Sequence, residues 1–353
     1  MDKRKQPMNI LIVKLSAIGD VIHTLPSLAV LRKLYPEAHI TWVIEEASAD
    51  LIAGHPHLDR VIVSRRKRWL RELRDPRKAG QALKEIKEFL KSLRDRPYDL
   101  VIDFHGLFKS ALIVLISGGR RKLGYDSMQE LSGLFLNEKI PEDMGKHAVD
   151  RYLDFLRYLK APKTQPEFFI PISEENKRRV EELLKKSGLD RGERFVAVSP
   201  MALWETKLWE DEKFARLCDR ITGELGVKVV LTGSEEGGMN RRIQSLMTKP
   251  SINLGGMTTL RDLACVYRAS LLLITTDSGP MHIAVAVATP VIALFGPTSP
   301  SRTGPYGEGN IVIRKEMDCS PCFLKKCESR QCMKDISVDD VFKAVKEMLK
   351  GKM

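Results

Sequence analysis

Four widespread functional motifs are missing from this sequence of 353 residues. It contains no G-x-G-x-x-G, no G-x-x-x-x-G-K-[ST], no H-E-x-x-H and no G-x-S-x-G. Each of these motifs serves a chemical need, such as a glycine turn that brings backbone N–H groups to a phosphate. Their absence argues against the commonest dinucleotide-binding, P-loop, zinc-protease and hydrolase functions.

Long hydrophobic runs are missing as well. No stretch reaches the roughly 18 apolar residues that are needed to cross a bilayer. The basic start, residues 1–20, has only a short apolar segment and no small-residue cleavage site, which argues against a secretion signal. We interpret it as a tail that leads into a first strand, and we expect a cytoplasmic protein that can touch a membrane surface.

Acidic residues are outnumbered by basic ones. There are 46 Asp and Glu against 58 Lys and Arg, which gives a net charge of +12. This excess indicates an anionic partner, such as a phosphorylated ligand, a nucleic acid or an anionic lipid. The stretch Arg65–Lys78 alone holds eight basic and two acidic residues. It is either a solvated helix face or a docking patch for a phosphorylated, carboxylate-bearing glycolipid, because arginine forks suit both groups.

Strand and helix patterns alternate along the chain. Continuous apolar runs are typical of parallel strands, and the segments between such strands must cross over as helices. Residues 160–173, with three prolines, separate two such series. The predicted strands are Asn9–Leu15, His39–Glu45, Val61–Ser64, Asp99–Phe104, Phe195–Ser199, Lys228–Thr232, Leu271–Thr275 and Val291–Phe295. The predicted helices are Val21–Leu34, Lys109–Ile116, Tyr152–Leu159, Glu174–Ser187, Glu210–Glu224, Asn240–Thr248, Leu260–Arg268, one from Met281, and Val338–Leu349.

This alternation predicts an α/β protein with two Rossmann-like, doubly wound parallel-sheet domains that face a central cleft. We assign residues 1–160 to an N-terminal domain, 161–173 to a linker and 174–353 to a C-terminal domain. The last helix can pack back on the N-terminal domain. Ligands of such sheets bind at the carboxyl ends of the strands.

The stretch Leu271–Pro300 contains a strand, a tight turn and a helix that can hold an anion. Asp277 or Ser278 can cap the helix, Gly279 lets the backbone approach a ligand, and Pro280 suits the first helical turn. Backbone N–H groups and the helix dipole at such a start favour a diphosphate. The alternative is an ordinary capped helix.

A second candidate site is the loop from Leu15 to Pro26. Gly19 permits a close turn, and Asp20 follows it at the start of a helix. Asp20 is either a general base that takes a proton from an attacking hydroxyl or an N-capping aspartate. We interpret His23 as a packed structural histidine.

Six segments spread along the chain form a recognisable set. They are Leu11–Pro26 (LIVKLSAIGDVIHTLP), Trp42–Glu46 (WVIEE), Val101–Leu112 (VIDFHGLFKSAL), Lys207–Trp209, and Thr276–Ala284 followed by Phe295–Thr298. Together these segments resemble the ADP-heptose:lipopolysaccharide heptosyltransferases, glycosyltransferase family 9, and within it the heptosyltransferase I members. The resemblance implies the GT-B fold and an inverting, metal-independent transfer of heptose from ADP-L-glycero-D-manno-heptose to a Kdo sugar of the lipopolysaccharide inner core. The absence of a D-x-D spacing agrees with a metal-free diphosphate site.

The resemblance also implies the site residues and the partners. Asp20 falls on the catalytic base of the family. The N-terminal domain would bind the acceptor, Kdo-lipid A, and the C-terminal domain would bind ADP-heptose. We expect no nucleic acid partner, and we expect a peripheral location on the anionic surface at the cytoplasmic face of the inner membrane. The donor-binding candidates are Lys207, Asp277, Ser278, Gly279, Pro280, His282, Met257, Glu236, Ser199 and Thr206, with the alignment at Glu236 open by a residue or two; the acceptor-binding candidates are Arg65, Arg66, Arg68, Lys109 and Gly19.

Two residues near the acceptor candidates are left without an assigned role. His105 stands where the family pattern leads us to expect glutamine. Trp69 either stacks on a sugar or lies on the surface as an amphipathic anchor.

The six cysteines fall into two groups. Cys218 and Cys265 lie in predicted helices and are expected in the core. The other four form the pattern C-x2-C-x4-C-x4-C, which is tight enough for a structural zinc or iron–sulfur site, although free thiols or a disulfide are alternatives. No cofactor is expected for catalysis. These four cysteines are Cys319, Cys322, Cys327 and Cys332.

Two other functions are weighed against a heptosyltransferase I activity. One is a family member that acts on another heptose or hexose acceptor of the core, because acceptor choice depends on loop shape. The other is a basic nucleic-acid-binding protein, which no aromatic-rich RNA-binding motif or helix-turn-helix signature supports.

Overall fold

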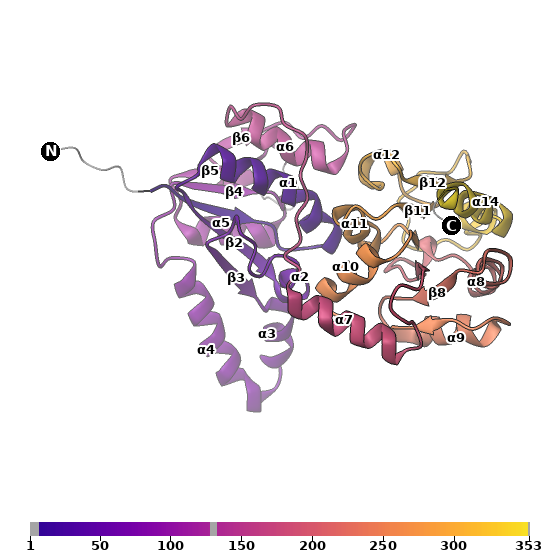
Figure 1. Cartoon of the computed structure of the whole chain (residues 1–353). Helices are drawn as coiled ribbons and strands as arrows, with labels where there is room; N and C mark the ends of the chain where they lie inside the picture. The colour runs from indigo at the N-terminus through magenta and orange to yellow at the C-terminus, as the bar shows by residue number, and fades with distance from the viewer. Residues whose placement is uncertain (1–6, 128–132, 352–353) are drawn as a thin grey trace. The chain divides into compact units, whose positions relative to one another are not determined.

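The computed structural model describes residues 7–127 and 133–351, so the first six residues of the basic tail lie outside the described residues. The chain divides into two compact units, residues 1–171 and 172–353 (Figure 1). The division falls inside the range 161–173 that we assigned to a linker. Each unit is described below by itself.

Unit 1 contains a six-stranded sheet in which every pair of neighbouring strands is parallel. The order is β3-β2-β1-β4-β5-β6, so the chain starts in the middle of the sheet, proceeds to one edge and returns to build the other. The order therefore reverses between β1 and β4, which is the place where such folds bind ligands. The strands are β1 (Asn9–Val13), β2 (His39–Glu45), β3 (Arg60–Ser64), β4 (Leu100–Asp103), β5 (Arg121–Tyr125) and β6 (Glu138–Ile140).

Six helices accompany this sheet in the described residues of unit 1. Helix α1 packs against α6, and eleven consecutive residues of α1, from Val21 to Leu31, are buried. Helices α3 and α4 form a hairpin that extends from the β3 edge of the sheet (Figure 1). The helices are α1 (Ile18–Leu34), α2 (Glu46–Ala49), α3 (Arg66–Glu72), α4 (Pro76–Ser92), α5 (Phe108–Ser117) and α6 (Ala148–Tyr158).

Unit 2 repeats the same topology. Its six parallel strands have the order β12-β11-β10-β7-β8-β9, with the reversal between β7 and β10. The strands are β7 (Phe195–Ser199), β8 (Lys228–Leu231), β9 (Ile252–Asn253), β10 (Leu273–Thr276), β11 (Val291–Phe295) and β12 (Ile311–Arg314). The helices are α7 (Glu174–Lys186), α8 (Asp211–Leu225), α9 (Met239–Leu246), α10 (Leu260–Ala269), α11 (Gly279–Ala286), α12 (Pro300–Thr303), α13 (Gln331–Lys334) and α14 (Val338–Leu349), with two short 3₁₀ turns, η2 (Glu205–Lys207) and η3 (Glu236–Gly238).

The last helix completes the core of unit 2. Phe342 and four other buried residues of α14 belong to the same hydrophobic cluster as Trp209 and the strands β7, β8, β10 and β11. The indole Nε1 of Trp209 donates a hydrogen bond of 3.0 Å to the carbonyl of Ile336, just before this helix. The apolar face of α14 is thus part of the unit 2 core, and packing of this helix on the N-terminal domain stays a prediction.

The two sheets confirm the α/β class and the doubly wound topology. The ranges predicted for β2, β7, β11 and α14 agree with the structure residue for residue. Helix α1 begins at Ile18, three residues earlier than expected, so that Gly19 and Asp20 lie within its first turn. In the described residues, no helix has both the length and the apolar composition that a membrane span requires.

Candidate active site

Asp20 projects from the first turn of α1, directly after β1. Its Oδ2 accepts a hydrogen bond of 3.2 Å from the backbone N–H of Ala17, the residue that precedes the helix. Its side chain is nevertheless 40% exposed. The N-cap residue is Ala17 and not Asp20, so the expectation of an N-capping aspartate is corrected: Asp20 is the third residue of α1 and binds back to the N-cap backbone. Its role as a general base stays a prediction.

Two buried side chains lie behind Asp20 and were missed in the sequence analysis. The hydroxyl of Tyr152 on α6 lies 3.3 Å from Asp20 Oδ1, and the ammonium of Lys14 lies 4.0 Å from Oδ2. Lys14 had a visible signal, since it is a charged residue directly after four apolar residues of a buried strand. Tyr152 had none, because it reaches Asp20 from 132 residues away.

The segment after β4 reaches the same edge of the sheet. Asp103 is buried and accepts hydrogen bonds from the backbone N–H groups of His105 (2.9 Å) and Gly106 (3.1 Å) and from the Ser110 hydroxyl (2.8 Å). Burial raises the pKa of Asp103, and these bonds oppose the rise. Burial, helped by the charges of Lys14 and Lys109, lowers the pKa of His105 to about 3, so its imidazole is neutral at physiological pH.

Lys109 and Arg66 meet at a buried glutamate. Lys109 Nζ lies 3.2 Å from Glu45 Oε1 and donates to the Ser16 hydroxyl at 3.1 Å. Arg66 lies 3.4 Å from the same Glu45 oxygen. The structure thus brings Lys109 to the loop that precedes Asp20, and its role as an acceptor contact stays a prediction.

The other two arginine candidates are also paired with glutamates. Arg65 contacts Glu46 at 2.9 Å, and Arg68 bonds to Glu85. Glu85 also accepts a hydrogen bond of 2.9 Å from Trp69, whose ring is buried and lies 5.3 Å from that of Phe89. Trp69 is therefore neither a sugar platform nor a surface anchor in this structure but holds α3 against α4.

In unit 2, Lys207 and Asp277 form an ion pair at the reversal of strand order. Lys207 follows β7, Asp277 follows β10, and Lys207 Nζ lies 2.6 Å from Asp277 Oδ2. The same carboxylate oxygen accepts a 2.6 Å hydrogen bond from Thr298, and the Lys207 ammonium lies over the ring of Trp204. The Lys207 side chain is only 16% exposed, so it is largely buried beside this carboxylate.

Helix α11 begins beside this pair, but its cap differs from the expectation. Ser278 occupies the N-cap position, yet its hydroxyl donates to the carbonyl of Thr276 at 3.2 Å and makes no capping bond. Asp277 is engaged by Lys207 and Thr298 instead. Neither side chain caps the helix, so we correct that expectation. Gly279 and Pro280 form the first turn as predicted, and His282 is buried in the same turn.

The remaining donor candidates lie along the carboxyl edge of the second sheet. Ser199 ends β7 and is buried, and its carbonyl accepts a 2.9 Å bond from Thr275. The loops after β8 and β9 are joined by a 2.9 Å bond from Gly256 to Gly233, which brings Met257 close to the turn that contains exposed Glu236. Its neighbour Glu235 pairs with Arg241 at 2.7 Å.

Thr206 differs from these residues. It is buried, and its hydroxyl donates a hydrogen bond of 2.7 Å to the carbonyl of Leu324. This contact fixes the chain segment that contains the four clustered cysteines.

The described residues give no support to a metal site at the cysteines. All six are free thiols, and no group of three or more His, Cys, Asp or Glu side chains in residues 7–127 and 133–351 is arranged to hold a metal ion. Cys218 and Cys265 are buried, as expected. Burial raises the pKa of Cys218 to about 12 and that of Cys265 to about 11, so both thiols stay protonated.

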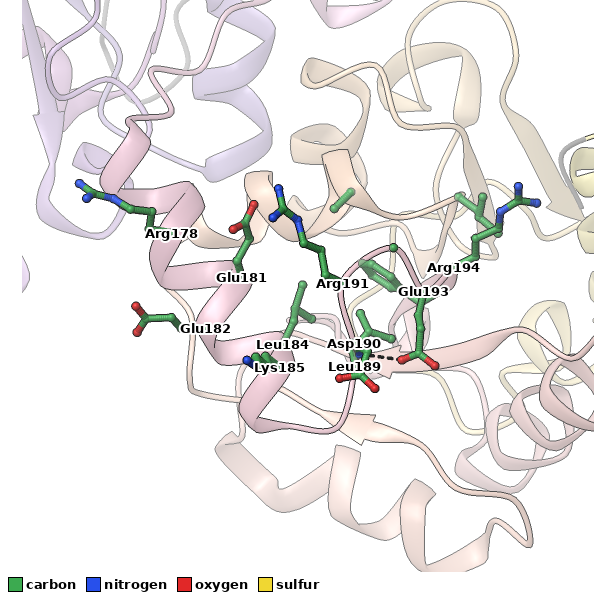
Figure 2. Close-up of a pocket in the computed structure, with 14 residues that line it drawn as sticks. Arg178, Glu181, Glu182, Leu184, Lys185, Leu189, Asp190, Arg191, Glu193 and Arg194 are labelled. Atoms are coloured by element: carbon green, nitrogen blue, oxygen red, sulfur yellow. Dashed lines mark hydrogen bonds between the residues drawn. The ribbon is translucent and has the colours of Figure 1, made fainter.

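A cavity of about 680 Å³ lies elsewhere in unit 2, between α7 and the segment that leads into β7 (Figure 2). Charged residues of both signs line it, among them Arg178, Arg191, Glu181 and Glu193. Phe195 lines it as well. It therefore lies at the amino end of β7, and none of the site candidates lines it.

Comparisons with known proteins identify the family of this chain. Residues 86–333 match the model of the family described as glycosyltransferase family 9 (heptosyltransferase). The chain is 31% identical to lipopolysaccharide heptosyltransferase 1 of Pseudomonas aeruginosa, over 95% of this chain and 91% of that protein.

Solved structures show the same similarity. A glycosyl transferase family 9 structure from Veillonella parvula has a TM-score of 0.80 at 26% identity and covers 98% of this chain and 97% of its own. The structure of E. coli heptosyltransferase WaaC with ADP-2-deoxy-2-fluoro heptose has a TM-score of 0.73 at 25% identity, with coverage of 96% and 99%. With two doubly wound sheets in sequence, these likenesses confirm the GT-B fold.

Proposed function

Because the chain belongs to glycosyltransferase family 9, the heptosyltransferases, we propose that it transfers heptose from ADP-L-glycero-D-manno-heptose to a Kdo sugar of the lipopolysaccharide inner core. The transfer inverts the anomeric centre and needs no metal. One observation carries most weight: each sheet has a reactive group at its reversal point, Asp20 in unit 1 and the Lys207–Asp277 pair in unit 2.

Unit 2 binds the donor in this proposal. The diphosphate of ADP-heptose lies against Lys207 and the first turn of α11, because an ammonium and a helix N-terminus both attract anions. As the bond from the anomeric carbon to the diphosphate oxygen breaks, the electron pair stays on that oxygen. Lys207 then neutralises the charge of the leaving ADP, as a metal ion does in other transferases. The heptosyltransferase structure with an ADP-heptose analogue supports this choice of donor.

Unit 1 supplies the base. A hydroxyl of the acceptor sugar attacks the anomeric carbon from the face opposite ADP, and its proton passes to the Asp20 carboxylate. One C–O bond forms while another breaks, so the configuration inverts. The exposed carboxylate oxygens of Asp20 suit this role, whereas buried Asp103 already accepts three hydrogen bonds.

Basic side chains of unit 1 bind the acceptor in this proposal. Lys109 lies beside the loop of Gly19 and Asp20, and Arg65, Arg66 and Arg68 follow β3 on α3 and its N-cap. Arginine forks suit the carboxylate of Kdo and the phosphate of lipid A. Another heptose or hexose of the core is the alternative acceptor, since the same groups recognise phosphorylated core sugars.

The decisive experiment incubates the purified chain with ADP-heptose and Kdo-lipid A and follows the product by mass. We expect addition of one heptose, with unchanged rate in excess EDTA. A parallel incubation with a heptosylated core acceptor identifies the alternative. No product with either acceptor contradicts the proposal, and loss of activity in EDTA contradicts metal independence. Metal analysis of the same preparation tests the four-cysteine site.

The α3–α4 hairpin is the surface that we propose to contact the anionic membrane. Ala82 is the one buried residue on α4, and Leu70 and Leu83 are 51% and 58% exposed. Exposed basic side chains surround these leucines. Apolar side chains that insert at the interface and cations that attract anionic headgroups together favour such binding. The exposed basic residues are Lys67, Arg71, Arg74, Arg77, Lys78, Lys84, Lys87 and Lys91.

Sedimentation with vesicles tests this contact. We expect binding to phosphatidylglycerol-containing vesicles, weakened by salt, and none to pure phosphatidylcholine. The double variant Leu83→Ser and Leu90→Ser should release the protein, because these leucines are 58% and 37% exposed on the hairpin. Leu246→Ser, at a leucine of unit 2 that is 46% exposed, should not. Vesicle binding that the double variant does not weaken contradicts the hairpin as the contact surface. Preferential displacement of the protein from vesicles by RNA argues for the nucleic-acid alternative.

A further inference from the structure

A buried lysine lies directly behind the carboxylate that we assign as the base. Lys14 is 3% exposed, and its ammonium donates hydrogen bonds to the carbonyl of Phe104 at 3.0 Å and to the hydroxyl of Tyr152 at 2.6 Å. Burial lowers the pKa of Lys14, while the Asp20 and Asp103 carboxylates oppose that shift. Burying an ammonium is costly unless it is paired. The Lys14 ammonium is therefore held by hydrogen bonds to Phe104 and Tyr152 and by the nearby carboxylate of Asp20.

Tyr152 connects this lysine to Asp20. Its hydroxyl accepts from Lys14 and lies 3.3 Å from Asp20 Oδ1, and its ring packs edge-on against Phe104. Burial raises the pKa of Tyr152 well above its ordinary value, so the hydroxyl keeps its single proton. Because Lys14 acts as a donor to this oxygen, the proton of Tyr152 is directed to the carboxylate.

The second oxygen of Asp20 is held as well. Oδ2 accepts from the Ala17 N–H at 3.2 Å and lies 4.0 Å from the Lys14 ammonium. Three contacts, from Lys14 after β1, Ala17 before α1 and Tyr152 on α6, thus fix the rotamer of a side chain that remains 40% exposed. Pre-organisation of this kind matters for a group that must meet a hydroxyl within hydrogen-bond distance.

Other charged and titratable groups lie near Lys14, Tyr152 and Asp20 and influence them electrostatically. His105 follows β4 and is neutral, and Lys109 on α5 adds a second positive charge near it. Asp103 at the end of β4 and the pair Arg151–Glu142 act on Lys14 from the other side. Lys14 is the only one of these groups with a hydrogen bond to Tyr152 among the contacts of the described residues.

We propose that Lys14 and Tyr152 are positioning residues that aim the Asp20 carboxylate at the acceptor hydroxyl and keep it in its unprotonated form before transfer. Neither residue touches substrate or takes part in bond making. The proton of the acceptor passes to Asp20, and the Lys14 charge disfavours earlier uptake of a proton from solvent. This inference rests on the proposed role of Asp20 as the base.

Kinetics of two variants test the proposal. Tyr152→Phe removes only the hydroxyl, and we expect kcat to fall about tenfold with KM for ADP-heptose unchanged, since the lost bond is to a charged group. Lys14→Met removes the charge, and we expect the acid limb of the kcat/KM profile to move to higher pH, because Asp20 then binds a proton more readily. Lys14→Arg keeps the charge and should restore the position of the acid limb.

The matched control is Tyr125→Phe. Tyr125 is also a buried tyrosine of unit 1 and packs on Phe155, but no hydrogen bond links it to Asp20 among the described residues. It should retain the wild-type rate and pH profile. Thermal unfolding of every variant separates loss of fold from loss of positioning.

Three outcomes overturn the proposal in distinguishable ways. Folded Tyr152→Phe and Lys14→Met enzymes with the wild-type pH profile and kcat would remove the positioning role and leave the heptosyl transfer intact. The same loss of activity in Tyr125→Phe would show a packing effect. A wild-type chain without transfer to either acceptor would remove the proposed function itself, and this inference with it.

Discussion

The proposed role of Asp20 as the general base can be tested directly by substitution. It serves the helix through its bond from Ala17, and it presents oxygen to solvent. A general base contributes about 10²–10⁴ to a rate, so its loss is measurable without loss of binding. Because the residues that we propose to bind the donor lie in unit 2, loss of the base and loss of donor binding can be measured separately.

Asp20→Ala should leave ADP-heptose binding nearly unchanged and lower kcat by at least about 100-fold, because the proton acceptor is gone while the donor contacts remain. Calorimetry with ADP-heptose and single-turnover transfer measure the two effects. Asp143→Ala, an exposed aspartate in unit 1, is the control. Unchanged turnover in Asp20→Ala would exclude Asp20 as the base.

Lys207→Ala should weaken donor binding and turnover together. The lysine stabilises charge that grows as ADP leaves, and removal of one such preorganised group costs about 10²–10³ in rate. Steady-state kcat and KM for ADP-heptose check this, with Lys186→Ala on the exposed face of α7 as the matched control. Wild-type kinetics in Lys207→Ala would contradict the assignment.

The helices differ in how much of the fold depends on them. Helix α14 supplies Val341, Phe342 and Val345 to the core of unit 2, whereas α4 buries only Ala82. This contrast suggests different roles for the two helices, α14 in the core and α4 on the surface. An element with a buried face is held by packing, and an element without one is available for a partner.

Phe342→Ala should destabilise unit 2 by about 3–5 kcal/mol, since it removes a fully buried aromatic side chain and leaves a cavity. Denaturant unfolding measures the change. Lys343→Ala, the next residue and exposed, should change stability by less than about 0.5 kcal/mol. Equal stabilities of the two variants would show that α14 is not part of the core.

The pattern of apolar runs predicted β2, β7 and β11 to the residue, because strands buried on both faces carry an unbroken local signal. The same rule missed β5, whose residues RKLGY begin with two basic side chains, one exposed and one half-buried, and so interrupt the apolar run. It also missed α3 and α4, where the basic residues hid a helical pattern.

Candidate sites followed the same division. Asp20 and Asp277 lie shortly after strand ends, and local sequence marked both as candidates, whereas Lys207 became a candidate only through the family resemblance. Lys14 and Tyr152 act through a contact over 138 residues, which no local pattern contains. The glutamates that pair with Arg65, Arg66 and Arg68 likewise come from other elements.

The whole molecule consists of two units with the same strand order and separate buried cores. Domains with their own cores generally fold alone. The proposed division of labour, acceptor in unit 1 and donor in unit 2, can therefore be tested by separation.

The fragment 172–353 should unfold cooperatively on heating and bind ADP, because Lys207, Asp277 and α11 all lie within it. Scanning calorimetry and titration with ADP provide the measurements. The same fragment with Lys207→Ala should bind ADP much more weakly. A fragment that folds but does not bind ADP would place the donor site elsewhere.

The glutamates that pair with Arg65, Arg66 and Arg68 reduce the net attraction of this face for an anionic ligand. An incoming phosphate or carboxylate does not meet bare guanidinium groups but must displace Glu46, Glu45 or Glu85. Each contact is thus an exchange of one anion for another, and its net gain is far smaller than the attraction of an unpaired cation. For the acidic glycolipid that we propose as the acceptor, this exchange favours release after each turnover.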